Sequence, residues 1–158
     1  MAHGAGEPRP IIPLTGQYYD STRDLAWLVI RVAAGGMLLE HGIVKLMYSS
    51  ITAFAAGSMA RRGIEPAVPA AYAVFFLETV GAICIILGLF TRLFAAMIFV
   101  EFLVIIFVAN WGGGLANFAW TRPGGGWEYP LFWQMSWLAI ILRGGGPYSL
   151  DRKLGREF

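Results

Sequence analysis

The sequence predicts an all-α integral membrane protein, an up-down four-helix bundle with a short interfacial helix between the first two spans. Hydrophobic residues make up 57% of the 158 residues and charged residues only 14%, whereas charged residues approach a quarter of a soluble domain. The apolar residues gather in four stretches close to the ~20 residues that cross a ~30 Å hydrocarbon core. Most connections between the stretches are short, which makes neighbouring helices antiparallel.

The four expected spans differ in length and in how they are delimited. Asp24 suits a helix cap before the first, Pro69 suits the first turn of the second, and glycine runs follow the third and fourth. The fourth is short, and an aromatic belt formed by Trp127, Tyr129, Trp133 and Trp137 is expected to anchor it in the membrane interface. The expected spans are Leu25–Met47, Ala67–Phe90, Leu93–Trp111 and Trp127–Leu142.

Two connecting segments have distinctive compositions. Ile51–Glu65 carries apolar residues near helical spacing before the basic pair Arg61 and Arg62, which predicts an interfacial helix, with a plain surface loop as the alternative. Ala109–Tyr129 is rich in glycine and aromatic residues. Its irregular backbone is too polar to face lipid, so we expect this segment at the interface or against a partner.

The expected organisation has three parts: an extended N-terminal arm at 1–23, a four-span membrane domain at 24–146 and a basic tail at 147–158. Basic residues are unevenly distributed between the two sides of the membrane. The positive-inside rule therefore predicts that both termini lie in the cytoplasm of a bacterial inner membrane. The richer side collects Arg9, Arg23, Arg92, Arg143, Arg152, Lys153 and Arg156, against Arg61, Arg62 and Arg122 on the other.

Several classes of function do not fit the composition. A net charge of +2 without a basic run argues against a nucleic-acid partner. Cys84 is the single cysteine, so neither an internal disulfide nor a CxxC redox pair is available. No second histidine or cysteine stands at ligand spacing from His41, which disfavours a metal site. No catalytic residue is assigned.

Charged residues within the spans are the candidate functional residues, because ionisable groups are costly in hydrocarbon unless they face protein or water. Arg31, Gly35, Gly42 and Lys45 fall on one stripe of the first span, and Glu78 shares a stripe with glycines of the second. Antiparallel packing then predicts an ion pair between Arg31 and Glu78. Such a pair either takes part in chemistry or only locks the bundle together.

A second cluster lies nearer the non-cytoplasmic end of the first span. There His41 has Glu40 beside it and Lys45 one turn on. A neutral imidazole exchanges protons with a quinone headgroup, ligates haem or metal, or hydrogen-bonds a carbonyl, and all three alternatives stay open. Glu40 is close enough to the helix end to reach water. Glu101 lies midway along the third span, and we expect it to be protonated or paired.

The order of these motifs resembles the DoxX family of small four-helix bacterial membrane proteins, over about Asp24–Arg152. The resemblance rests on Arg31 with His41-Gly42-x-x-Lys45, Glu78-x-x-Gly81 through Gly88-x-Phe90-Thr91-Arg92, Gly-Gly-Gly-Trp-Glu-Tyr-Pro at 124–130 and Tyr-Ser-Leu-Asp-Arg at 148–152. It implies an inner-membrane protein with relatives in quinone-linked sulfur oxidation or thiol and oxidative-stress systems. The sequence departs from a thiol-redox role, because its single cysteine, Cys84, cannot form an internal disulfide.

Three functions follow from these observations. The first is an accessory subunit of a larger membrane redox or energy-converting complex, non-catalytic by itself. The second is a quinone-interacting subunit of a sulfur- or thiol-linked oxidoreductase, in which Arg31, His41, Lys45 and Glu78 contact the quinone. The third, less favoured because no internal repeat or broken helix is evident, is a small-molecule or proton carrier. The expected partners are lipid and other membrane subunits.

Overall fold

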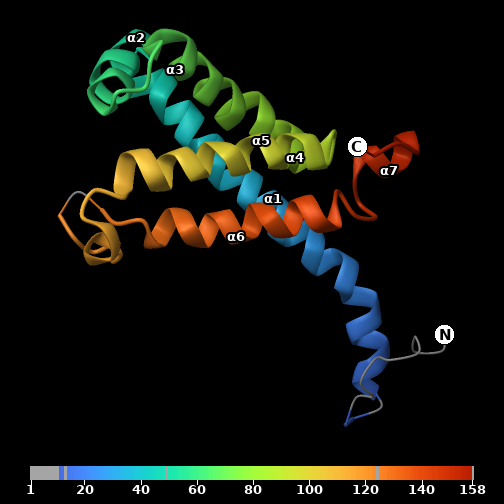
Figure 1. Cartoon of the computed structure of the whole chain (residues 1–158). Helices are drawn as coiled ribbons and strands as arrows, with labels where there is room; N and C mark the ends of the chain where they lie inside the picture. The colour runs from blue at the N-terminus through green and yellow to red at the C-terminus, as the bar shows by residue number, and fades with distance from the viewer. Residues whose placement is uncertain (1–10, 13, 49, 124, 158) are drawn as a thin grey trace.

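A computed structural model of the chain describes residues 11–12, 14–48, 50–123 and 125–157, and within these ranges the protein is entirely helical, without strands. Figure 1 shows the long helix α1 (Leu14–Tyr48) crossing behind α5 (Thr91–Val104) and α6 (Glu128–Arg143), which lie side by side in front of it. The all-α fold expected from the sequence is confirmed. Residues 1–10 and 13 of the predicted arm lie outside the described part.

The first span belongs to α1, Leu14–Tyr48, which has 35 residues. At 1.5 Å per residue its length is about 52 Å, well beyond a ~30 Å hydrocarbon core. The helix therefore begins within the segment assigned to the arm, about ten residues earlier than the sequence predicts. Its N-terminal part projects from the bundle in Figure 1.

The predicted interfacial helix is present as three consecutive short turns: α2 (Ile51–Phe54), the π-helical η1 (Ala55–Met59) and the 3₁₀ helix η2 (Ala60–Arg62). Ser50 caps the start by accepting a hydrogen bond from the Ala53 amide at 3.1 Å. Ala55 and Met59 are buried against Ala71 of the second span. This unit therefore packs on the bundle as an amphipathic helix should.

The second and third spans each contain a π-helical turn. The second span consists of α3 (Ala67–Phe76), the π turn η3 (Leu77–Gly81) and α4 (Ala82–Leu87). The third consists of α5 (Thr91–Val104) followed by the π turn η4 (Ile105–Asn110). Together with α1, these are the three helices long and apolar enough to cross a membrane among the described residues. π-Helical turns are rare in proteins overall, but those that occur are often found at functional sites.

The fourth span is α6, Glu128–Arg143, whose 16 residues reach about 24 Å. Before it lies the short η5 (Gly114–Asn117), and after it comes α7 (Leu150–Leu154). Trp137 and Ile140 of α6 are buried in the common core with Ala34 and Ile98. The short fourth helix is thus part of the bundle and not a separate surface segment.

Glycines bring α1 and the second span into close contact, as their stripes predict. A Cβ added at Gly35 would lie 2.7 Å from the Ile86 side chain, and one at Gly42 would lie 2.8 Å from the Glu78 carbonyl oxygen. Gly81, in turn, faces Phe94 of α5, and an added Cβ there would come within 3.3 Å of that ring. Small residues let membrane helices approach in this way, and the contacts fix the register of the charged residues.

Candidate functional site

The predicted ion pair between Arg31 and Glu78 is wrong. Arg31 is fully buried, but it donates to backbone carbonyls: Nη1 to Ile85 at 2.6 Å and Ile86 at 2.9 Å, and Nη2 to Tyr148 at 2.5 Å. The last carbonyls of a helix lack a full set of partners within it, and the Ile85 carbonyl accepts from the Gly88 amide at 3.1 Å in addition to Arg31. A guanidinium with several donors in a fixed fork suits such a cluster, so Arg31 joins three segments of the backbone.

The helix register explains why the predicted pair does not form. Gly42 of α1 lies against Glu78, and Arg31 lies eleven residues earlier on α1. Eleven residues correspond to about 16 Å along a helix, which exceeds the reach of an arginine side chain. Lys45 is only three residues beyond Gly42, one turn along the same face, and is therefore at the depth of Glu78.

Lys45 is the partner of Glu78. Its ammonium group donates to Oε1 of Glu78 at 2.7 Å and also contacts Oε2. Glu78 is almost completely buried, and its side chain emerges from the π turn η3. Lys45 also lies over the Phe54 ring, 5.2 Å from its centre. The pair thus ties α1 to the second span beneath the interfacial helix.

Beside this pair is a membrane-embedded cavity of about 490 Å³, called cavity A, between the second and third spans and under the interfacial helix. Lys45, Arg62, Glu78 and Glu101 supply its charged groups. Glu101 is only 7% exposed. Neither of its carboxyl oxygens has a hydrogen-bond partner among the described residues. The apolar lining includes Phe54, Met59, Leu77, Met97, Val104 and Ile105.

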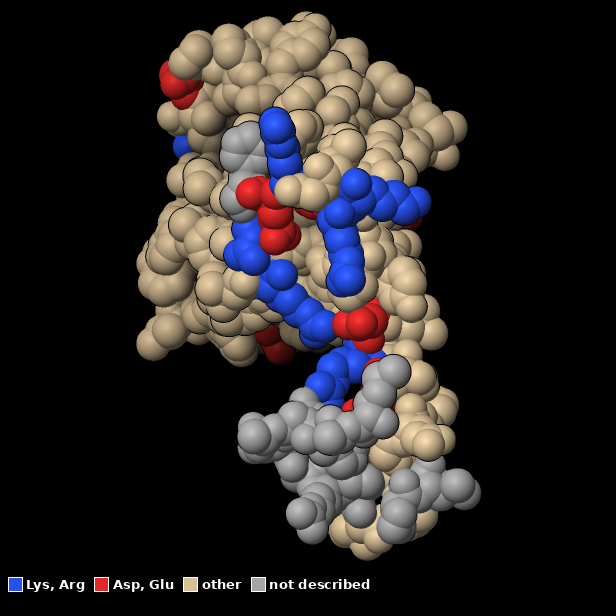
Figure 2. All heavy atoms as spheres, turned by 90° about the vertical axis from the view of Figure 1, so that its right-hand side faces the viewer, with Lys and Arg blue, Asp and Glu red and all other residues tan. Residues whose placement is uncertain are grey.

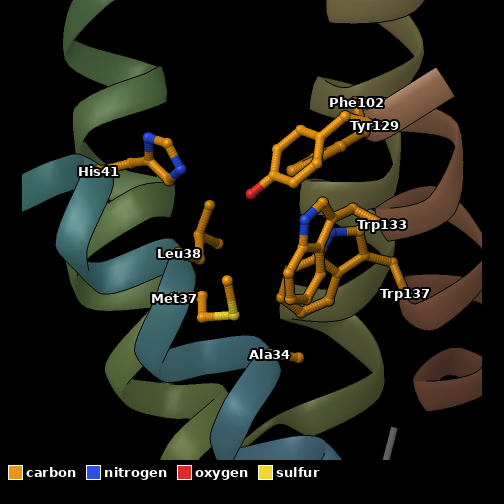
Figure 3. Close-up of a pocket in the computed structure, with 8 residues that line it drawn as sticks. All are labelled: Ala34, Met37, Leu38, His41, Phe102, Tyr129, Trp133 and Trp137. Atoms are coloured by element: carbon orange, nitrogen blue, oxygen red, sulfur yellow. The ribbon is translucent and has the colours of Figure 1, made fainter. Parts of the chain in front are cut away.

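A second opening, called groove B, lies between α1 and α6 and has a volume of about 350 Å³. His41, Glu78, Asn110 and Tyr129 provide its polar groups. Deeper between the helices it continues into a narrow pocket lined by Trp133 and other residues of α1, α5 and α6. Figure 3 shows the Tyr129 hydroxyl pointing toward α1, the helix that carries the exposed His41.

Cavity A and groove B meet at one residue of the predicted site. Glu78 lines both, whereas Lys45 lines only cavity A and His41 only groove B. Ile105 and Asn110 also border both spaces. Three of the four predicted site residues therefore lie together, with Lys45 on one side of Glu78 and His41 on the other. Arg31 belongs elsewhere.

The opposite end of the bundle, called the latched end, holds Asp151 and Trp27 in internal hydrogen bonds, while Nε of Arg31 has no hydrogen-bond partner among the described residues. Asp151 accepts hydrogen bonds from the amides of Phe90 (2.7 Å) and Thr91 (2.9 Å) and from the Thr91 hydroxyl (2.7 Å). Trp27 donates its indole N–H to the Gly144 carbonyl at 3.0 Å. Figure 2 shows this end of the molecule, where basic and acidic side chains intermix over its surface. Arg31 reaches this network through Tyr148.

Sequence reasoning missed two features of the site. It assigned Tyr129 and Trp133 to an aromatic belt, but they line the openings between α1 and α6. It left the role of Glu101 open, although a carboxyl midway along an apolar helix was the available signal. Glu40 is exposed, in agreement with its expected access to water.

Comparisons with known proteins identify the family of this membrane domain. The family model described as DoxX matches residues 26–111. That range covers the first three spans and includes Lys45, Glu78 and Glu101. No curated protein and no solved structure matches the chain.

Proposed function

The chain belongs to the DoxX family, and we propose that it is a quinone-binding membrane subunit that works with an electron-carrying partner. One observation carries the proposal. A membrane-embedded apolar cavity holds the ion-paired Lys45 and Glu78 together with the buried, unpartnered Glu101. Such groups are expensive inside a membrane and mark sites that bind or move ligands and protons.

The chemistry of cavity A suits a quinone headgroup. A volume of about 490 Å³ falls in the range of sites for small organic ligands, which combine apolar walls with a few placed polar groups. Quinone carbonyl oxygens accept hydrogen bonds, and the Lys45 ammonium is a donor beside the apolar walls. Glu101 supplies a second polar group in the same cavity.

The position of cavity A also favours a ligand that arrives through lipid. Met97, Val100 and Val104 line the cavity and are exposed on α5, at 40%, 58% and 40%. In a membrane these side chains border the acyl chains, so a ligand dissolved in the bilayer has a lateral approach. An isoprenoid tail could remain in lipid while the headgroup lies between the spans.

Electrons must come from another protein. Lysine and glutamate side chains bind and exchange protons, but electron transfer requires a cofactor or a thiol pair. The proposal therefore includes a sulfur- or thiol-linked oxidoreductase as partner, with the chain in a bacterial inner membrane and both termini on the cytoplasmic side.

A second candidate, an accessory role within a larger membrane assembly, is favoured by the N-terminal part of α1. This segment projects from the bundle in Figure 1, and its Tyr18 and Tyr19 are 65% and 57% exposed. A helical segment of about ten residues is marginal in isolation, so contact with another subunit would stabilise it. Migration of the purified protein as a lone small species in mild detergent would contradict this role.

Equilibrium binding of decylubiquinone to the protein in lipid nanodiscs tests the quinone proposal. We expect saturable binding that Glu101→Gln weakens at least tenfold, which corresponds to about 1.4 kcal/mol. Glu40→Gln is the matched control, because Glu40 is exposed and does not line cavity A. Absence of saturable binding, or equal affinities for all three proteins, would contradict the proposal. A menaquinone analogue tested in parallel defines the headgroup preference.

A further inference from the structure

Glu78 lies between cavity A and groove B and borders both. Lys45 contacts the Glu78 carboxylate from within cavity A. Groove B approaches the same residue from the other side, with His41 in its lining. A protonatable group therefore stands on each side of one carboxylate, in two separate openings of the bundle.

We propose that His41, Glu78 and Lys45 form a proton path that leads from groove B to a quinone in cavity A. The inference rests on the quinone-binding function proposed above. His41 is exposed, so its imidazole exchanges protons with water at the mouth of the groove. Glu78 is almost completely buried and links the two openings.

The dimensions and polarity of groove B suit the first step. A volume of about 350 Å³ admits several water molecules, and His41, Asn110 and Tyr129 offer them hydrogen bonds. His41 is close enough to Glu78 for the two groups to interact electrostatically. Water in the groove would connect the imidazole with the carboxylate without a direct contact between them.

The transfers balance when the partner oxidoreductase supplies the electrons. On reduction of the quinone, Lys45 gives one proton to a quinone oxygen and becomes a neutral amine. The imidazolium of His41 then gives a proton to the Glu78 carboxylate, and Glu78 passes that proton on to Lys45. Water then reprotonates His41. Two electrons from the partner and two passages of this relay convert the quinone to the quinol, and the side chains return to their starting states.

The charged and titratable groups around Glu78 fit this direction of transfer. Lys45 and His41 of α1 face Glu78, and Glu101 of α5 interacts with Glu78 electrostatically. Tyr129 of α6 lines groove B. Lys45 holds the carboxylate on the cavity side. On the groove side lies the exposed His41.

The relay is testable with quinone bound to the protein in nanodiscs and a low-potential viologen as the electron donor. The rate of quinol formation is followed by stopped-flow absorbance. We expect His41→Ala to bind decylubiquinone with unchanged affinity but to form quinol about a hundredfold more slowly, the lower end for loss of a proton-transfer group. Added imidazole should restore the rate, since it enters groove B and replaces the missing proton carrier.

Two further variants make the outcome decisive. Glu40→Gln is the neighbouring control and should retain the rate of the unaltered protein. His41→Gln keeps hydrogen bonding without proton exchange and should be slow. A normal rate in both His41 variants, or slow rates that imidazole does not restore, would overturn the relay even where quinone binding is intact. Failure of the unaltered protein to bind quinone would instead overturn the proposed function, and the relay with it.

Discussion

At the latched end of the bundle, the buried guanidinium of Arg31 donates to three carbonyls and Asp151 accepts from two amides and a hydroxyl. At the other end, Glu78 forms an ion pair with Lys45. The carboxyl group of Glu101 there has no hydrogen-bond partner among the described residues. Both ends contain buried charge beside cavities, but among the described residues only the second end has a buried carboxyl without a hydrogen-bond partner in a cavity lining. Satisfied charge indicates architecture, whereas unsatisfied charge beside a cavity indicates a ligand.

The largest effect on stability is expected at the latched end, for Arg31→Leu. The substitution removes the guanidinium donor from the Ile86 and Tyr148 carbonyls and leaves the Ile85 carbonyl with the Gly88 amide, so we expect the free energy of unfolding to fall by about 3 kcal/mol. Unfolding by dodecyl sulfate in mixed micelles measures the change. Arg152→Gln, at an exposed position of α7, is the control and should stay within about 0.5 kcal/mol. Equal stabilities of the two variants would show that the hydrogen bonds of Arg31 do not stabilise the bundle.

The contact between α1 and the second span beside Glu78 is tested by Gly42→Ala. The added Cβ would lie 2.8 Å from the Glu78 carbonyl oxygen, so α1 must move away from the second span at a cost of about 2 kcal/mol. The shift would also lengthen the pair between Lys45 and Glu78 and weaken decylubiquinone binding.

Gly36→Ala is the matched control, because an added Cβ there meets nothing within 4 Å. The same unfolding assay should give unchanged or slightly higher stability, since alanine favours a helix by about 1 kcal/mol over glycine. Similar losses in both variants would show that helix packing at Gly42 is not the cause.

A smaller loss is expected for Asp151→Asn. An amide has one acceptor oxygen where the carboxylate has two, so at least one of the three hydrogen bonds to Phe90 and Thr91 is lost, at about 1 to 2 kcal/mol. Thr91→Val removes the hydroxyl partner alone. Unfolding of the two single variants and the double variant should show non-additive losses; additive losses would mean that the two residues act independently.

The smallest expected change has the opposite sign and belongs to Glu101→Leu. Replacing a buried, unpartnered carboxyl by an apolar side chain removes a desolvation cost, so we expect stability to rise by about 1 kcal/mol while quinone binding is lost. Thermal unfolding and decylubiquinone titration of the same sample measure both quantities. A loss of 2 kcal/mol or more would assign Glu101 to the structure and not to a ligand.

The comparison of the two ends also explains which features could be predicted from the sequence. Hydrophobic stretches of spanning length identified the membrane helices, and the spacing of Ile51, Phe54 and Met59 identified the interfacial helix. Glycine stripes identified the contact between α1 and the second span. These are local patterns, each with a direct physical cause.

Features that depend on register or on backbone groups could not be predicted in the same way. The choice between Arg31 and Lys45 as partner of Glu78 depends on which residue Gly42 faces, and that is known only from packing. Carbonyl acceptors such as those of Ile85 and Tyr148 leave no mark in a sequence. The early start of α1 was hidden by polar residues at 14–24, which resemble an arm by composition.

Photolabelling by an azido-quinone tests the central claim most directly, because it locates the ligand without relying on a substitution. The protein in nanodiscs is irradiated with the probe, digested and mapped by mass spectrometry, with excess decylubiquinone as competitor. We expect labelling within cavity A that excess decylubiquinone reduces, on the segments around Phe54–Met59 and Met97–Ile105. Competed labelling confined to the latched end, or labelling that decylubiquinone does not reduce, would contradict it.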